Sequence, residues 1–169
     1  MHILDGGSAF RTSATGGVVI VSSGGSADTG VVESGGYMDV LAGGLIVSTI
    51  ALNANMNIAG AANSNWVTNG TVNVLNGGSV VNTSQTGGVF NVSNGGATVD
   101  NFMFDTEMNI AGVANNNIVS GGVFNVLDGG SVESTIYTGS SFNVESGAVQ
   151  SAIPLPMPKL LLQVQLSIM

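Results

Sequence analysis

The fold is decided by the stretch Gly87-Gly88-Val89-Phe90-Asn91-Val92-Ser93-Asn94-Gly95-Gly96, the best-formed copy of a unit that returns along most of the chain. In an extended strand Phe90 and Val92 share one face and Asn91 lies on the other, because side chains alternate. The flanking glycine pairs can adopt the positive φ that sharp turns require. The unit therefore predicts a short β-strand between two glycine-marked corners.

The core of this unit recurs at a nearly fixed spacing. Its closing aliphatic residue stands at positions 40, 58, 74, 92, 110, 126 and 144, so the intervals are 18, 16, 18, 18, 16 and 18 residues. Such self-similarity is the signature of a repeat architecture. A longer repeat of 52 residues overlies it, since Met56-Asn57-Ile58-Ala59-Gly60 returns as Met108-Asn109-Ile110-Ala111-Gly112. We place the two-residue deletion of the shorter units at the Ala-Gly corner.

We therefore predict an all-β fold, a single-stranded parallel β-solenoid of about eight rungs of roughly 18 residues, over residues 1–153. Each period is expected to hold two short strands. Stacking about 4.8 Å apart would align equivalent residues in columns. A meandering β-sandwich also suits closely spaced turns, but it would not require the same residue at the same phase of every unit. The predicted core column consists of Met38, Met56, Val72, Phe90, Met108, Phe124 and Phe142.

An asparagine stands at one phase of six successive units. Stacked amides can hydrogen-bond from rung to rung, as in other cross-stacked structures. In the simpler interpretation this ladder only stiffens the rod. In the functional interpretation it is a polar stripe that binds a carbohydrate or another rod. The ladder consists of Asn57, Asn73, Asn91, Asn109, Asn125 and Asn143.

Composition argues against several partners. Charged residues are only 7% of the chain and the net charge is -8, with Arg11 and Lys159 as the two basic residues. Two bases cannot neutralise many phosphates, so we expect no nucleic acid partner and no binding to anionic membrane surfaces. No apolar stretch approaches the roughly 20 residues of a membrane-spanning helix, so no membrane insertion is expected. The chain has no cysteine, which excludes disulfides and Cys-ligated metals.

The sequence offers little catalytic chemistry. His2 is the single histidine and stands near the terminus, and the acidic residues are scattered over different phases of the repeat. Neither a calcium-binding nonapeptide repeat nor a phosphate-binding loop occurs. We expect no cofactor, no metal and no enzymatic activity, and keep a carbohydrate-active β-helix enzyme as a third alternative. Trp66 and Tyr137 are either exposed sugar-stacking aromatics or aromatics packed at a rung edge.

Over roughly residues 5–153, the repeats resemble the passenger repeats of the AIDA-type self-associating autotransporter adhesins of Gram-negative bacteria. That family's unit has two Gly-Gly corners, a valine shortly before one corner and a threonine in the following strand. The matching valines are Val21, Val40, Val74, Val92, Val126 and Val144, and the matching threonines are Thr29, Thr49, Thr83 and Thr135.

The resemblance implies a right-handed solenoid displayed outside the cell, on the bacterial surface, that mediates aggregation or adhesion. It also implies modification by a glycosyltransferase, with Ser26, Ser79 and Ser131 as candidate acceptors. The expected partner is the chain itself, with host-surface glycans or proteins as further partners. The alternative function is a subunit that polymerises end to end into an extracellular fibre through its open rung edges.

Residues 154–169 differ from the repeats. They contain all three prolines and the only lysine, and an amphipathic strand follows with Leu162, Val164, Leu166 and Ile168 on one face. Three interpretations stay open for this extension: a cap over the last rung, a non-native sequence, or a segment that pairs with another molecule. The N-terminus reads as the middle of a repeat array, so we expect the chain to be part of a longer protein.

Overall fold

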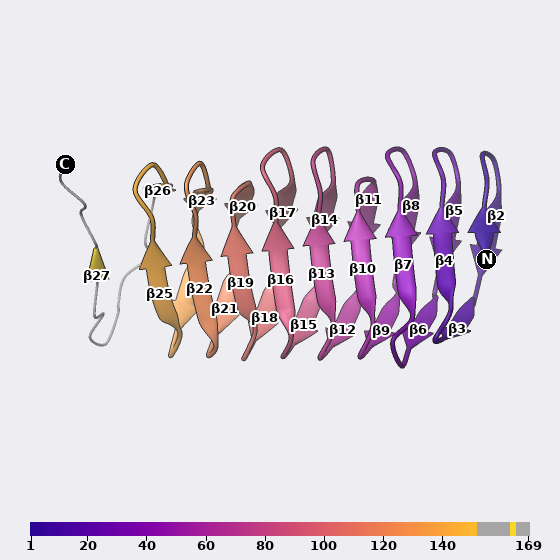
Figure 1. The fold of residues 1–169 in the computed structure, drawn as a ribbon, viewed down its shortest axis with the longest axis horizontal. Helices are drawn as coiled ribbons and strands as arrows, with labels where there is room; N and C mark the ends of the chain where they lie inside the picture. The colour runs from indigo at the N-terminus through magenta and orange to yellow at the C-terminus, as the bar shows by residue number, and fades with distance from the viewer. Residues whose placement is uncertain (152–162, 165–169) are drawn as a thin grey trace.

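The computed structural model describes residues 1–151 and the backbone of residues 163–164. The described chain winds into eight full turns, and each turn holds three short strands that pair in parallel with the equivalent strands of the neighbouring turns. Figure 1 shows the turns side by side along a straight rod, with the N-terminus at one end and the last repeat at the other. The predicted all-β, parallel β-solenoid with a period of about 18 residues is confirmed.

The strands form three sheets that run the length of the rod, here called A, B and C. Sheet A contains β1 (His2–Ile3), β4 (Val18–Val21), β7 (Tyr37–Val40), β10 (Asn55–Ile58), β13 (Thr71–Val74), β16 (Val89–Val92), β19 (Glu107–Ile110), β22 (Val123–Val126), β25 (Ser141–Val144) and β27 (Gln163–Val164). Sheet B contains β2 (Ser8–Phe10), β5 (Ser26–Asp28), β8 (Leu45–Val47), β11 (Ala61–Asn63), β14 (Ser79–Val81), β17 (Ala97–Val99), β20 (Val113–Asn115), β23 (Ser131–Glu133) and β26 (Val149–Ser151). Sheet C contains β3 (Ser13–Thr15), β6 (Val31–Glu33), β9 (Ile50–Leu52), β12 (Trp66–Thr68), β15 (Ser84–Thr86), β18 (Phe102–Phe104), β21 (Ile118–Ser120) and β24 (Ile136–Thr138).

The coil is right-handed, as the resemblance implied. In Figure 1 the strands of sheet A rise on the near side, and the chain returns downward behind them. During each turn the chain advances from the N-terminal end, at the right of the view, toward the left.

The prediction of two strands per turn is wrong, because the strands of sheet C were missed. A turn such as β16, β17 and β18 bends from sheet B to sheet C at Asp100 and Asn101. Asp100 takes a φ of 57° there, and seven other non-glycine residues do the same at this corner in the other turns. Polar side chains tolerate this left-handed conformation better than most. The corner therefore needs no glycine pair, and the glycine pattern in the sequence does not mark it.

The core column lies in register along sheet A. Met56 pairs with Met38 and Val72, Phe90 pairs with Val72 and Met108, and Phe124 continues the column to Phe142. All seven side chains point into the rod and are buried. The rings of Phe124 and Phe142 lie 5.2 Å apart between centroids, within the range for favourable aromatic pairs. Equivalent side chains therefore stack directly on one another in the interior.

In the two turns that are two residues shorter, the missing residues are at the corner between sheet A and sheet B. Most turns have a four-residue corner there, such as residues 93–96 between β16 and β17. The corner shrinks to Ala59-Gly60 between β10 and β11 and to Ala111-Gly112 between β19 and β20, which confirms the predicted place of the deletion. A Cβ atom on Gly60 would collide with the carbonyl oxygens of Gly44 and Leu41, so this tight corner requires glycine.

At the C-terminal end, β27 pairs in parallel with β25, so that Gln163 lies beside Asn143 and Val164 beside Val144. Sheet A therefore gains a tenth strand beyond its last repeat. The rest of the predicted extension 154–169, including Leu162, Leu166, Ile168 and the boundary at residue 153, lies outside the described residues. The capping role stays a prediction.

Candidate functional site

The candidate functional surfaces are the three long outer faces of the rod. Within residues 1–151, the middle residue of each strand in sheets B and C points inward, and the first and third residues point outward. In the four-residue strands of sheet A the first and third residues point outward. Register turns each outward position into a column that continues from turn to turn. Each face is therefore a repeating array rather than a single pocket.

Two other kinds of site were sought in the described part of the chain. No helix there could cross a lipid bilayer. No three His, Cys, Asp or Glu side chains gather there in a group that could hold a metal ion.

The six predicted asparagines form a continuous ladder on the outer face of sheet A. Each side-chain amide donates a hydrogen bond to the side-chain oxygen of the preceding turn, and Asp39 accepts the first of these bonds. The donor–acceptor distances are 2.7 Å from Asn57 to Asp39, 2.9 Å from Asn73 to Asn57, 2.9 Å from Asn91 to Asn73, 3.0 Å from Asn109 to Asn91, 2.7 Å from Asn125 to Asn109 and 2.7 Å from Asn143 to Asn125.

This ladder leaves a polar strip on the surface. Most of its side chains are half-buried between their neighbours, and only Asn143, at the C-terminal end, is exposed. One N–H and the oxygen of each internal amide are used within the ladder, which leaves the second N–H to face outward. Asn109 directs its amide nitrogen also to Glu107, at 3.1 Å. The strip can therefore offer a row of hydrogen-bond donors to a partner.

The candidate acceptors Ser26, Ser79 and Ser131 occupy one outward column of sheet B. They are the first residues of β5, β14 and β23, and each side chain is half-buried. Ser79 lies between Ala61 and Ala97 in this column. The three hydroxyls therefore lie on one face of the rod, but other rungs lie between Ser79 and the other two candidate serines.

A second polar ladder, which the sequence interpretation missed, lies inside the corner between sheets B and C. Asn65 accepts from the backbone N–H of Thr49 at 3.1 Å, and Asn101 accepts from that of Thr83 at 2.8 Å. Asn117 accepts from the backbone N–H and the side-chain amide of Asn101, at 3.1 and 2.8 Å. The buried ladder consists of Thr49, Asn65, Thr83, Asn101, Asn117 and Thr135.

The buried ladder explains most of the threonines on which the family resemblance rests. Thr49, Thr83 and Thr135 belong to it. The Thr135 hydroxyl accepts from the backbone N–H of Asn117 at 3.4 Å and the Thr83 hydroxyl from the side-chain amide of Asn65 at 3.4 Å, whereas the Thr49 hydroxyl has no partner among the described residues. Thr29 does not belong to it and was assigned wrongly. It takes a φ of 54° on the exposed side of the corner, and Gly30 occupies the inner position.

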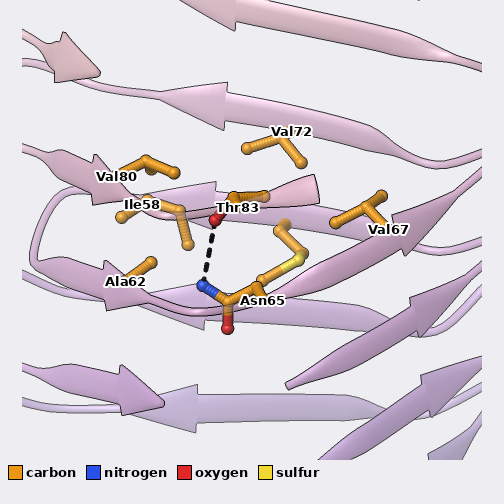
Figure 2. A pocket seen from close by; sticks show the side chains of 8 residues that line it. Ile58, Ala62, Asn65, Val67, Val72, Val80 and Thr83 are labelled. Carbon is orange, nitrogen blue, oxygen red and sulfur yellow. Dashed lines mark hydrogen bonds between the residues drawn. The ribbon is translucent and has the colours of Figure 1, made fainter. Parts of the chain in front are cut away.

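A small interior space adjoins this ladder. Figure 2 shows it between Asn65 and Thr83, with the side chains of Ile58, Ala62, Val67, Val72 and Val80 around it, and Met56 completes the lining. It has no room for a water molecule. Ala62 stacks between Ile46 and Val80, so the space arises where a small residue follows larger ones. It is a gap in packing and offers no ligand site.

The outer face of sheet C carries an apolar column that the sequence interpretation also missed. Its side chains are the first residues of successive strands, and they pair in register along the sheet. Trp66 is the most exposed, at 59%. From Ile50 onward, the column could have been found by carrying the 16- and 18-residue intervals onto this phase of the repeat. This sheet C stripe consists of Val31, Ile50, Trp66, Ser84, Phe102, Ile118 and Ile136.

The two aromatics considered for sugar stacking differ in position. Trp66 lies on the outer face, whereas Tyr137 is buried, with its ring stacked on Phe142 at 4.3 Å between centroids. Tyr137 is the middle residue of β24 and so points inward. The structure leaves only Trp66 available to a ligand, and Tyr137 belongs to the core.

No family model and no curated protein matches the sequence. Among solved structures, the chain is similar to a hyper-glycosylated fragment of TibA, modified by TibC, with 26% identity and a TM-score of 0.53 over 89% of this chain and 80% of that chain. It also matches QnrB1, a plasmid-mediated fluoroquinolone resistance protein, with 12% identity and a TM-score of 0.34 over 86% of this chain and 92% of that chain. The second likeness is too low to support an argument about fold or function. The first supports the β-solenoid fold.

Proposed function

We propose that this chain is an adhesive β-solenoid of the bacterial cell surface, which acts by self-association or by adhesion to other surfaces. The observation that carries the proposal is the register of eight turns, which repeats each outward side chain along the rod. A repeated array can bind through many weak contacts whose combined strength exceeds that of any one contact. The likeness to the TibA fragment supports this proposal, together with the resemblance of the repeats to AIDA-type passengers.

We infer a structural rather than a catalytic role. The TibA fragment supports this inference because it is a target of modification by TibC. A carbohydrate-active enzyme, the third alternative, would need an acid pair placed across a sugar-binding cleft. The outer faces described above are repeating columns, which suit a long contact better than a reaction at one bond.

The favoured partner is a second copy of the chain, and host-surface glycans or proteins are the other candidates. The end-to-end fibre receives less support in sheet A, where it would use the outer edge of β25. That edge pairs with β27. An exposed strand edge, by contrast, would template the addition of another strand.

Display of the chain on a non-clumping bacterium tests the adhesive role. We expect cells that carry it to settle faster than cells that carry an unrelated β-solenoid of similar size, and free chain added in excess should slow the settling. Binding of the same cells to glycan arrays and to host cells separates the partners. The adhesive role is wrong if displayed chain changes neither settling nor binding.

We further propose that Ser26, Ser79 and Ser131 accept sugars. Support comes from their outward position on sheet B and from the hyper-glycosylated state of the TibA fragment. Co-expression with TibC, followed by peptide mass spectrometry, should show hexose- or heptose-type mass additions at these serines. The triple Ser→Ala variant should lose them. Additions confined to other residues would contradict this assignment.

A further inference from the structure

The sheet C stripe is a largely apolar surface that no other part of the described chain covers. Ile50, Phe102, Ile118 and Ile136 are 41 to 44% exposed, and Trp66 is 59% exposed. Phe104, two residues beyond Phe102 on the same face, adds a further ring that is 43% exposed. Contiguous apolar patches of several hundred Å² on a soluble protein commonly mark an interaction site.

Charge favours this face as the place where two copies meet. The net charge of -8 makes two chains repel one another in general. Among the outward residues of β3 to β24 in sheet C, Glu33 is the single charged one, and it lies outside the stripe. Two copies can therefore approach through sheet C with less repulsion than through sheets A and B, whose outer faces carry the half-buried Asp39 and the exposed Glu107 and Glu133.

The order of residues in the stripe is nearly palindromic about Ser84. One rung away on either side lie the rings of Trp66 and Phe102. Two rungs away lie Ile50 and Ile118, and three rungs away lie Val31 and Ile136. A two-fold symmetric contact uses the same patch twice and so requires a self-complementary surface. The stripe meets that requirement.

From these observations we infer that sheet C is the surface through which two copies of the chain pack side by side, with their rod axes antiparallel. The two-fold axis lies between the two facing sheets and runs parallel to β15, at the level of Ser84. Trp66 of each copy then lies opposite Phe102 of the other, and Ile50 lies opposite Ile118. The inference rests on the self-associating form of the proposed function and names its contact surface.

The antiparallel arrangement follows from the two outward columns of sheet C. A two-fold axis along the strands reverses the rods but keeps first residues opposite first residues, so the apolar stripe meets itself. An axis along the rod would instead place first residues opposite third residues, such as Trp66 opposite Thr68 and Ile118 opposite Ser120. The first arrangement buries apolar surface against apolar surface, which is the favourable term.

The area fits a weak, reversible dimer. With about 150–250 Å² for each aromatic side chain, the stripe and Phe104 together expose on the order of 500 Å² of apolar surface. A stable interface of standard size buries about 800 Å² on each partner. The threonines and serines beside the stripe can supply part of the remainder, as a polar rim.

Sedimentation of the full chain over a concentration series provides the first test. We expect Trp66→Ser and Phe102→Ser each to weaken the dimer by at least about ten-fold, as for central aromatic anchors. The matched control is Phe10→Ser, which removes a 64% exposed ring on sheet B and should leave the dissociation constant unchanged. Because all three side chains are exposed, circular dichroism and melting should be unaltered. Higher salt should not dissociate the dimer, since the contact is apolar.

Cross-linking provides the second test, because the described chain has no cysteine to interfere. Packed sheets lie about 10 Å apart, too far for a disulfide but within reach of a short bis-maleimide. We expect Ile50→Cys chains to link to Ile118→Cys chains when the two are mixed, and Ile50→Cys chains alone to link poorly. Both positions are 41% exposed, so reactivity is matched. Efficient linking of Ile50→Cys to itself would show parallel rods and overturn the inference.

The remaining outcomes separate the two levels of the proposal. If the chain dimerises but the stripe variants dimerise equally well, the sheet C contact is wrong while self-association stands. If the wild-type chain stays monomeric at every concentration, both are wrong. Adhesion to glycans or host proteins would then be the surviving form of the proposed function, and a loss of that binding in Trp66→Ser would assign the stripe to such a partner.

Discussion

Asn57 donates its side-chain amide to the carboxylate of Asp39 at 2.7 Å, and this bond sets the direction of the whole surface ladder. A carboxylate can only accept, so Asn57 must turn its nitrogen toward Asp39 and its oxygen toward Asn73. Asn73 must then donate to Asn57 and present its own oxygen to the next turn, as observed. One acidic residue at the start of the row thereby aligns all the amides that follow.

Replacement of Asp39 tests this alignment. Asp39→Leu should lower the free energy of unfolding by about 1 kcal/mol, because it removes the acceptor of a charge-assisted hydrogen bond at a half-buried position. Asp39→Asn keeps an acceptor and should lose less. Urea denaturation of both variants provides the measurement. Equal stability of Asp39→Leu and the wild type would show that the ladder does not depend on its first acceptor.

The buried ladder should contribute more to the free energy of unfolding than the surface ladder. Asn101→Ala strands the backbone N–H of Thr83 inside the corner and removes the side-chain bond to Asn117, so we expect a loss of about 2–3 kcal/mol. Asn91→Ala removes the same amide from the half-exposed ladder, where water can replace it, and should cost about 0.5–1 kcal/mol. Denaturation midpoints of the two variants decide the order. A larger loss for Asn91→Ala would contradict the assignment of the corner as the stabilising network.

Alanine substitution of two glycines with similar backbone conformations distinguishes the cost of backbone strain from the cost of a steric collision. Gly88 and Gly129 have φ values of 75° and 78°, so alanine at either costs about 1–2 kcal/mol in backbone strain. A Cβ on Gly129 meets nothing within 4 Å, whereas a Cβ on Gly88 would collide with the carbonyl oxygen of Gly70 in the adjacent turn. We therefore expect Gly88→Ala to lower the melting temperature clearly further than Gly129→Ala. Similar melting temperatures would mean that the turns can move apart at little cost.

Tyr137 offers a substitution that should not destabilise. Its hydroxyl is buried and has no hydrogen-bond partner within the part of the chain that the structure describes, while its ring stacks on Phe142. Tyr137→Phe keeps the ring and removes the unsatisfied group, so the free energy of unfolding should stay the same or rise by about 1 kcal/mol. Thermal unfolding monitored by circular dichroism checks this. A clear loss of stability would reveal a bond to the hydroxyl.

The sequence predicted the sheet A strands well, because two signals coincide there. Each carries two inward aliphatic or aromatic residues, and a glycine pair follows the strand in most turns. The strands of sheet C carry a single inward residue, and that residue varies from Ala51 to Gln85 to Tyr137. A three-residue strand with one variable core position leaves no periodic signal strong enough to read, so the third side of the coil was missed.

The candidate surfaces were predicted only in part for a related reason. The asparagine ladder keeps one residue type in six successive turns, so it is visible in a single sequence. The sheet C stripe keeps only apolar character, with isoleucine, tryptophan and phenylalanine in turn and serine at its centre. Whether such residues face inward or outward depends on the number of strands in each turn, which the sequence interpretation had set at two.

The short corners at Ala59-Gly60 and Ala111-Gly112 make the rod divisible into interchangeable segments. Removal of residues 59–110 would join Ile58 to Ala111 and restore the same corner, with Val40 on one side and Val126 now on the other. The product would be three coils shorter with an unchanged cross-section. The length of such a rod therefore changes in discrete steps of three turns. Recombination that adds or removes one segment in the gene changes the length of the protein and keeps its fold.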